Sequence, residues 1–325
     1  MENNSSLLND NRMMISKKFL LSVYAILPIL FGVIMVDKFY LDSSLLPHFG
    51  VNGLALPLYL FLFGLPHIIG SFFSFFDGEY LDYYRKYLFF YLPGLLIATA
   101  ILLFVNFELG VVFFLVNDVW HGIKQKVGIA LILGAKLNWL HYLWTALPFI
   151  TSSLAFVYFL MPQVFPVYTL PYISPIIFVG AIILFFTMLA KIRESKPDVR
   201  LYIFLVSVLF FFNYYFILTG YIFFAILAFR VVHDASAFAF YIAHDYNRNI
   251  DGYKNIFYKL LSVVPLPVLV LTPALSILFA YFVRTATNGI TIGYGIVILI
   301  CMSHYYLESV MWKRNAPHRK YVKVV

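Results

Sequence analysis

The sequence has 325 residues, of which 62% are hydrophobic and only 12% are charged, and its formal net charge at pH 7 is +8. This composition excludes an ordinary soluble domain, whose exterior must face water, and predicts a helix bundle whose exterior faces lipid. The basic residues lie in short stretches between apolar runs, so they indicate membrane topology and anionic lipid rather than nucleic acid as a partner. The single cysteine, Cys301, excludes an intrachain disulfide and a cysteine-rich metal site.

Ten apolar runs approach or exceed the roughly 20 residues that cross a bilayer. They predict an all-α, polytopic integral membrane protein with about ten transmembrane helices, located in the cell (inner or plasma) membrane. Residues 1–17 form a polar tail, 18–312 a single transmembrane domain and 313–325 a basic tail. We interpret the first run as a retained helix, because no small-residue cleavage site is evident. The predicted helices are 18–37, 52–76, 88–106, 109–133, 138–161, 171–191, 200–219, 221–245, 256–282 and 288–312.

The charges of the connections predict the direction of these helices. Every second connection is basic, whereas the opposite connections hold only Lys38 and Arg284. Basic connections face the cytoplasm, so we expect an even number of helices and cytoplasmic N and C termini. The basic residues that lie in or around these connections are Arg12, Lys17 and Lys18; Arg85 and Lys86; Lys124, Lys126 and Lys136; Lys191, Arg193, Lys196 and Arg200; Arg248, Lys254 and Lys259; and Lys313, Arg314, Arg319, Lys320 and Lys323.

Four histidines fall inside even-numbered helices: His67 in the second, His121 in the fourth, His233 in the eighth and His304 in the tenth. Even-numbered helices all run from the outer face toward the cytoplasm. At about 1.5 Å per residue, each histidine lies near the middle of the bilayer or in its cytoplasmic half. Ionisable groups inside membrane helices usually face an interior site. The pattern therefore predicts that the four imidazoles converge and bind a metal or a haem.

Acidic side chains accompany three of these histidines. Asp118 precedes His121 by three residues and Glu308 follows His304 by four, so each pair shares a helical face. Asp234 follows His233 directly. These acids are candidate metal ligands or hydrogen-bond partners that orient a ligating imidazole, and we treat Asp118 and Glu308 as candidate catalytic residues.

Arg230 is a third candidate catalytic residue, because it stands inside its predicted helix, well away from the cytoplasmic end. It either pairs with Asp118 or Asp234 or binds a carboxylate or phosphate of a substrate. Among the other histidines, His141 is a candidate fifth ligand. His244 lies eleven residues after His233, roughly 16 Å along the helix, and is a candidate to line an entrance.

His48, in an outer connection, and His318, in the C-terminal tail, are interpreted as surface residues. Nitrogen and oxygen ligands without thiolate suit iron, zinc or copper. In a membrane, the function they favour is a non-haem iron oxygenase that hydroxylates, desaturates or cleaves an apolar lipid or isoprenoid-like substrate. A separate electron donor is a candidate partner. Two alternatives stay open: a bis-histidine haem oxidoreductase, and a proton- or metal-coupled transporter.

The dispersed single histidines His67, His121, His233 and His304 resemble the pattern of the bacterial and archaeal carotene-cleaving dioxygenases that form retinal. The resemblance spans most of the helical region. It implies a polytopic membrane fold, iron bound by intrahelical histidines and a carotenoid-like substrate.

Overall fold

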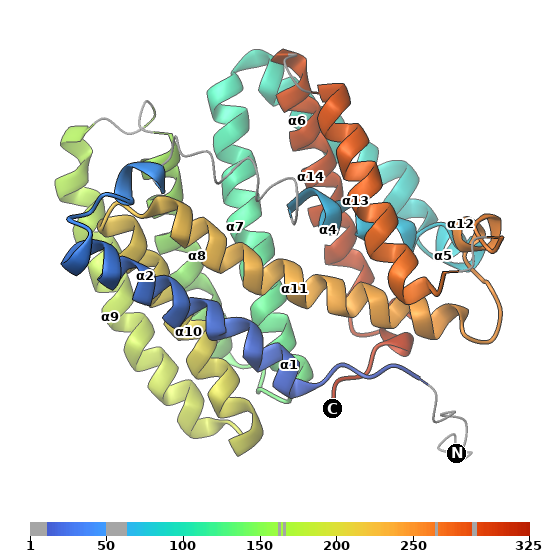
Figure 1. Ribbon diagram of the computed structural model, residues 1–325, viewed down its shortest axis with the longest axis horizontal. Helices are drawn as coiled ribbons and strands as arrows, with labels where there is room; N and C mark the ends of the chain where they lie inside the picture. The colour runs from blue at the N-terminus through green and yellow to red at the C-terminus, as the bar shows by residue number, and fades with distance from the viewer. Residues whose placement is uncertain (1–11, 50–63, 162–163, 165–166, 264–265, 288–290) are drawn as a thin grey trace.

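The computed structural model describes residues 12–49, 64–161, 164, 167–263, 266–287 and 291–325 of this chain, and these residues fold almost entirely into helices (Figure 1). Pairing of the β type within them is confined to two isolated bridges, Ile15 with Val324 and Asp77 with Asn255. The described elements, in chain order, are α1 (Lys17–Ser22), η1 (Val23–Ala25), α2 (Ile26–Tyr40), η2 (Leu46–His48), α4 (Leu65–Phe73), α5 (Gly78–Tyr83), η4 (Tyr87–Tyr91), α6 (Leu92–Val105), α7 (Phe107–Ile132), α8 (Trp139–Leu160), η5 (Val167–Thr169), α9 (Leu170–Glu194), α10 (Pro197–Leu218), α11 (Ile222–Asn249), α12 (Ile256–Leu260), α13 (Val268–Thr287), α14 (Thr291–Met311) and η6 (Pro317–Tyr321).

The predicted all-α class is confirmed, and eight helical segments in the described part of the chain are long and apolar enough to cross a membrane. They correspond to the predicted first, third and fifth to tenth helices. The predicted fourth helix forms as α7, which has 26 residues but contains four charged side chains: Glu108, Asp118, Lys124 and Lys126. Of the predicted second helix, residues 52–63 lie outside the described residues, and the part described is α4.

Two predicted boundaries illustrate how local chemistry ends a helix. The predicted break between the seventh and eighth helices is confirmed, because Gly220 adopts φ +87° between α10 and α11, a conformation that favours glycine. The single helix predicted over 256–282 is wrong. The structure has the short α12 and then α13, which begins directly after Pro267. A proline lacks the amide hydrogen that a continuing helix requires, and it disfavours the helical conformation of the preceding residue.

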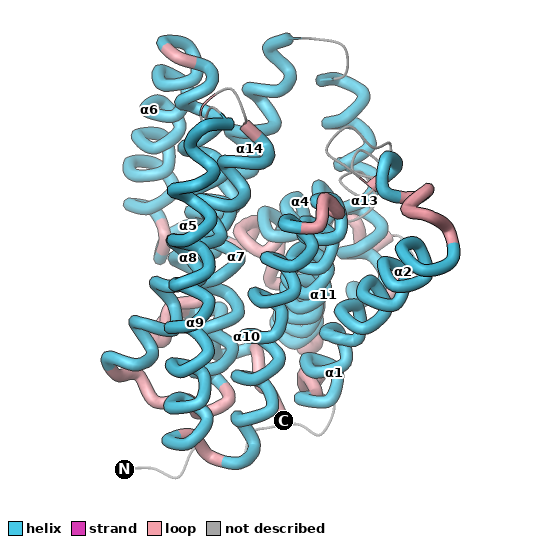
Figure 2. Tube along the Cα trace, turned by 90° about the vertical axis from the view of Figure 1, so that its left-hand side faces the viewer, coloured by secondary structure: helices cyan, strands magenta, loops and turns pink. Residues whose placement is uncertain are grey.

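Helix α11 crosses the middle of the molecule (Figure 1) and organises the packing. It contacts α10 and α2 as well as α4, α13 and α7. Figure 2 shows α1 and α2 along one side of α11, with α8, α9 and α10 on another. Helix α14 packs against α4, α6 and α7. Four elements carry the predicted site histidines, and they form a closed circuit: α11 contacts α4 and α7, and α14 contacts the same two helices.

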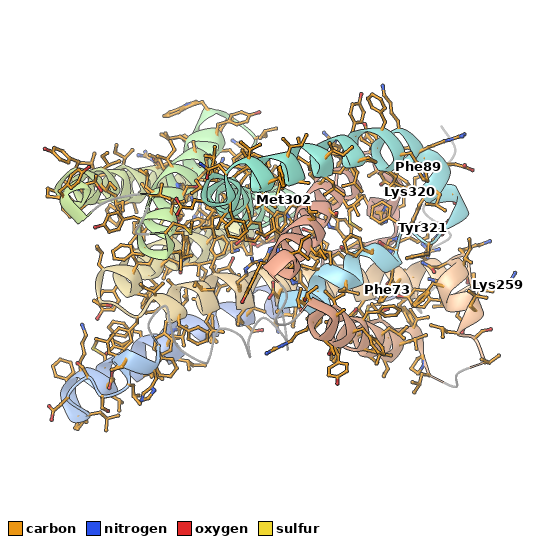
Figure 3. The ribbon with its side chains drawn as sticks, turned by 90° about the horizontal axis from the view of Figure 1, so that it is seen from above. Phe73, Phe89, Lys259, Met302, Lys320 and Tyr321 are labelled. Atoms are coloured by element: carbon orange, nitrogen blue, oxygen red, sulfur yellow. The ribbon has the colours of Figure 1, made fainter. Side chains whose placement is uncertain are left out.

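The outward faces of the helices are rich in large apolar side chains. Phe104 of α6 is 92% exposed, and Phe89, Phe178 and Phe186 are also largely exposed. Figure 3 shows Phe89 and Lys259 extending outward, whereas Met302 of α14, which is buried, lies in the middle of the bundle. Such an apolar exterior is unfavourable in water and is typical of a surface that contacts lipid.

The two ends of the described chain lie side by side (Figure 1). The amide of Ile15 donates to the carbonyl of Lys323 at 2.8 Å, and the amide of Val325 donates to the carbonyl of Ile15 at 2.9 Å. Asn247 of α11 joins both ends, because its side chain donates to the carbonyls of Met13 and Tyr321. The basic tail is thus fixed against the end of α11.

Candidate metal centre

The structure brings four predicted histidines together from four helices: His67 of α4, His121 of α7, His233 of α11 and His304 of α14. The ring centroids of His67 lie 5.1 Å from His233 and 4.8 Å from His304. Those of His121 lie 4.8 Å from His233 and 4.9 Å from His304. Three of the rings are fully buried, and His121 is 7% exposed. The four imidazoles therefore close a ring around one buried region.

Their ligand atoms fall into two groups that could each hold a metal ion. The first group consists of His121, His233, His304 and Glu308, and the second of His67, His233 and Asp234. Within each group the ligand atoms lie within 4.8 Å of one another, and every member is buried. Nitrogen and carboxylate oxygen ligands in this proportion suit a divalent first-row transition metal.

Close approach of the helices makes this convergence achievable. A Cβ added to Gly122, directly after His121, would stand 2.2 Å from the ring of Phe229 on α11. Only glycine therefore lets α7 come this near to α11, one turn from His233. Helix α4 likewise approaches α13 closely, because a Cβ added to Gly70 would stand 3.0 Å from the hydroxyl of Ser276 on α13. Pro66 lies in the first turn of α4, where its missing amide hydrogen is tolerated.

The hydrogen bonds of the imidazoles indicate which nitrogens are engaged. His304 Nδ1 lies 2.9 Å from the hydroxyl of Ser71, whereas its Nε2 has no hydrogen-bond partner among the described residues. His67 Nδ1 lies 3.2 Å from Asp234 Oδ1. Within the described part of the chain, neither ring nitrogen of His233 has a hydrogen-bond partner, although the ring is fully buried. Unpaired buried polar atoms are costly, and metal coordination would satisfy them.

Glu308 is oriented so that one carboxylate oxygen is held while the other faces the histidines. Its Oε1 accepts hydrogen bonds from the hydroxyl of Tyr241 and, at 3.3 Å, from Trp312 Nε1. Its Oε2 lies 3.2 Å from His121 Nε2. This arrangement leaves Oε2 as the ligand atom and fixes the direction in which it points.

Asp118 and Arg230 adjoin the centre but belong to neither ligand group. Arg230 Nη2 lies 2.5 Å from Asp118 Oδ1, and the hydroxyl of Tyr305 also donates to this carboxylate. The Tyr305 ring stacks on His121 with a centroid distance of 4.5 Å. Of the two roles expected for Arg230, pairing with Asp118 is therefore the one observed. Both residues contact the centre through Tyr305.

The other histidines lie elsewhere. The structure does not bring His141 to either group: it lies in the first turn of α8, where its ring contacts Trp144 at 5.9 Å. His48 is exposed, as expected of a surface residue. The interpretation of His318 as a surface residue is wrong, because its side chain is completely buried. The tail folds back over α11, and the ring is enclosed by Tyr80 and His244 at 4.1 and 4.6 Å.

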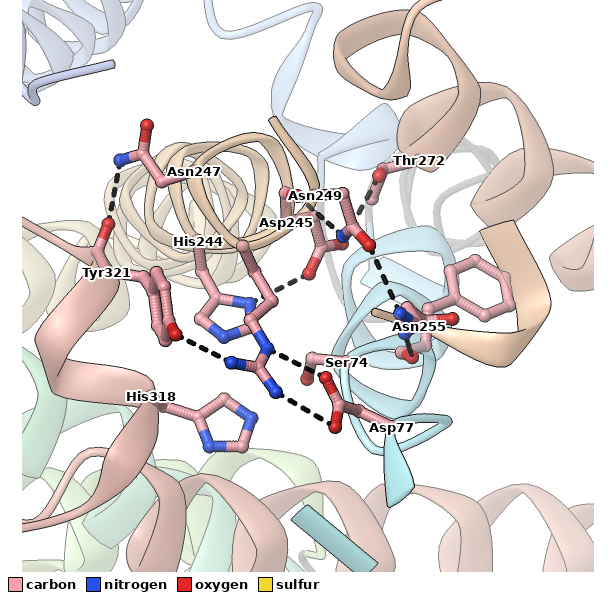
Figure 4. A network of polar contacts seen from close by, with 12 residues as sticks. Ser74, Asp77, His244, Asp245, Asn247, Asn249, Asn255, Thr272, His318 and Tyr321 are labelled. Atoms are coloured by element: carbon pink, nitrogen blue, oxygen red, sulfur yellow. Dashed lines mark hydrogen bonds and ion pairs between the residues drawn. The ribbon is translucent and has the colours of Figure 1, made fainter. Parts of the chain in front are cut away.

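A second polar cluster surrounds His244 and His318 at the far end of α11 (Figure 4). Arg248 donates to Asp77 at 2.8 and 3.1 Å and to the Tyr321 hydroxyl at 2.6 Å. His244 contacts the Tyr80 hydroxyl and Asp245, each at 2.9 Å. Burial, together with the charges of His244 and Arg248, lowers the pKa of His318 well below its usual value. Both nitrogens of His244 are engaged, so this cluster serves to fix the tail and α5 against α11.

Sequence reasoning missed four residues that contact the candidate metal ligands: Ser71, Tyr241, Tyr305 and Trp312. For two of them, the spacing from a predicted ligand gave a signal in the sequence. Ser71 follows His67 by four residues and Trp312 follows Glu308 by four, so each lies on the same helical face as a predicted ligand. Tyr241 has no such signal, because its contact with Glu308 is made between two helices.

The chain matches no protein-family model, and comparisons with curated proteins and with solved structures give no match either. The resemblance to carotene-cleaving dioxygenases therefore stays a prediction.

Proposed function

We propose that this protein is an integral membrane metalloenzyme that binds non-haem iron through its buried histidines and carboxylates and oxidises an apolar, lipid- or isoprenoid-like substrate with oxygen. The observation that carries the proposal is the buried convergence of four histidines with Glu308 and Asp234. Two histidines with one carboxylate, as in the group of His67, His233 and Asp234, is a ligand set typical of non-haem iron oxygenases and leaves coordination positions open.

The site lies among apolar helices whose outer faces are themselves apolar, which supports a substrate that arrives from the lipid. Bound iron would supply the activation of oxygen. The residues of the chain orient and insulate it: Ser71 orients His304, while Tyr241 and Trp312 orient Glu308. The Asp118–Arg230 pair neutralises a buried charge beside His121.

The packing of the rings favours iron without porphyrin over a bis-histidine haem. Each imidazole has two other imidazoles within 5.1 Å between centroids. A planar macrocycle placed between two opposing histidines would collide with the other two rings. A haem would also give an intense Soret absorbance, so an optical spectrum distinguishes the two cofactors directly.

The test is metal analysis of the detergent-purified chain, with an optical spectrum and an assay of oxygen uptake in the presence of carotenoids and membrane lipids. We expect iron without a Soret band, and a lowered iron content with loss of oxygen uptake in His304→Ala. Folded protein that binds no metal after anaerobic reconstitution with Fe(II) would overturn the proposal. Metal that binds but exchanges rapidly with an external chelator, with metal transport in proteoliposomes, would instead favour the transporter.

A further inference from the structure

We propose that the centre holds two metal ions and that His233, as an imidazolate whose N–H proton is released to solvent when the second ion binds, bridges them through its two ring nitrogens. This inference rests on the proposed function, because it concerns the same buried histidines. The first ion would bind His121, His304, Glu308 and one nitrogen of His233. The second would bind His67, Asp234 and the other nitrogen of His233.

The division of the ligand atoms is the first argument. Among the described residues, the ligand atoms that lie within 4.8 Å of one another form two groups, and His67 belongs to the second group but not to the first. A first-row ion binds nitrogen and oxygen at roughly 2.0–2.2 Å, so atoms that share an ion lie within about twice that distance. The grouping thus assigns His67 to a different ion from His121 and His304.

His233 is the only member common to both groups. Its two ring nitrogens point away from each other, and neither has a hydrogen-bond partner among the described residues. An imidazole that binds one ion normally donates its other N–H to a carboxylate, a carbonyl or water. His304 follows this rule through Ser71, whereas His233 has no such partner in the described structure. A second ion on the remaining nitrogen accounts for the difference.

The negative charges are also divided between the two groups of ligand atoms. Each group contains one carboxylate, Glu308 in the first and Asp234 in the second. Neutral imidazoles alone would leave each cation uncompensated in a buried site, which is costly. The positive charge of Arg230 is balanced by Asp118 at 2.5 Å, so it does not oppose a second cation. Each proposed ion therefore has an anionic ligand of its own.

The competing explanation is that Asp234 only orients His67 toward a single ion, through the 3.2 Å contact with His67 Nδ1. The two explanations differ in metal stoichiometry and in the effect of removing the Asp234 charge. Asp245 offers a matched control, because it is another aspartate on α11 and is equally buried, at 1% exposure against 2% for Asp234.

The experiment uses the full chain in detergent, stripped with a chelator, reconstituted anaerobically with Fe(II), freed of excess metal by gel filtration and analysed for iron per protein. We expect about two ions in wild type and in Asp245→Asn, and about one in Asp234→Asn and in Glu308→Gln. Reconstitution with Cu(II) gives an independent readout. Two copper ions joined by one imidazole couple magnetically, so the wild-type electron paramagnetic resonance signal per copper should be weak and should recover in Asp234→Asn.

One ion in both wild type and Asp234→Asn would overturn the bridged pair and leave the proposed function intact. Two ions that persist in Asp234→Asn without magnetic coupling would also overturn it, since the second ion would then lie elsewhere. Wild-type protein without any bound metal would refute the proposed function itself, so the two failures are distinguishable.

Discussion

Replacing Glu308 with glutamine tests the assignment of this carboxylate as a ligand most directly. The amide has nearly the same shape, and its oxygen can still accept from Tyr241 and Trp312, which donate to Oε1 in the native structure. The fold should therefore survive. What the substitution removes is the negative charge on Oε2, which lies 3.2 Å from His121 Nε2.

The expected loss of metal affinity can be bounded from below. Removing a hydrogen-bond partner of a ligand typically costs about 10–100-fold in metal affinity, and about 1.4 kcal/mol corresponds to each tenfold. Because Glu308 lies among the ligand atoms themselves, we expect its loss to reach or exceed the upper end, about 3 kcal/mol of binding free energy. The measurement is competition for Fe(II) or Co(II) against a chelator of known affinity, with the melting temperature of each variant recorded in the same detergent.

Asp118→Asn and His304→Ala complete the comparison. Asp118 pairs with Arg230 and belongs to neither ligand group, so Asp118→Asn should retain its metal and instead lose stability. Breaking a buried ion pair costs about 3–5 kcal/mol, and the partial exposure of Asp118, 17% for its side chain, places the cost at or below the lower end. His304→Ala should lose metal at least as severely as Glu308→Gln. Equal metal affinity in wild type and all three variants would remove the reason for regarding this protein as a metalloenzyme.

Three further predictions concern the rest of the chain. Cysteines placed at Lys196 and at Thr287, on a background without the native cysteine, should be labelled from opposite sides of the membrane; labelling from one side would refute the even helix count. Because burial lowers the pKa of His318, the unfolded state binds more protons than the folded state as the pH falls below about 6.5, so stability should decrease toward pH 5 by up to about 1.4 kcal/mol per pH unit. His318→Gln should flatten this melting-temperature profile, whereas exposed His48→Gln should leave it unchanged; an equally steep profile in His318→Gln would contradict the assignment. Arg248→Ala should lower the melting temperature, because leaving the buried Asp77 without its arginine reduces the free energy of unfolding by about 3 kcal/mol. Iron per folded protein should not change.

The helix class could be predicted well because it depends on composition and on runs of apolar residues, both of which are local properties. The sequence also largely indicated which histidines would lie close together. Histidines at similar depth on helices that run in the same direction converge if those helices are neighbours, as they are for His67, His121, His233 and His304. The sequence alone did not show that these helices would be neighbours. Their packing depends on close approaches such as that of Gly122 to Phe229, which lie more than 100 positions apart in the sequence.

The partners of the acids were harder to predict, because several pairings satisfy the same spacing. Asp118 shares a helical face with His121, yet its charge is taken by Arg230 from α11. Glu308 shares a face with His304, yet its free oxygen faces His121 on α7. In both cases the acid pairs with a residue of another helix, not with the histidine on its own helical face. The prediction that His318 is a surface residue was wrong for the same reason. His318 lies in a basic segment of the tail, and only the fold shows that this segment covers the end of α11.

The distribution of polar residues over the helices follows from how fully each helix is covered by its neighbours. Helix α11 carries Arg230, His233, Asp234, His244 and Arg248, a density that would be prohibitive for a helix bordering hydrocarbon. It is tolerated because α2, α4, α7, α10 and α13 surround it. Helix α6, whose side chains are mostly exposed, has no charged residue at all. Eleven residues, about 16 Å of rise, separate His233 from His244 on α11. One helix thus carries both candidate metal ligands and the cluster that anchors the tail, and it fixes the distance between them.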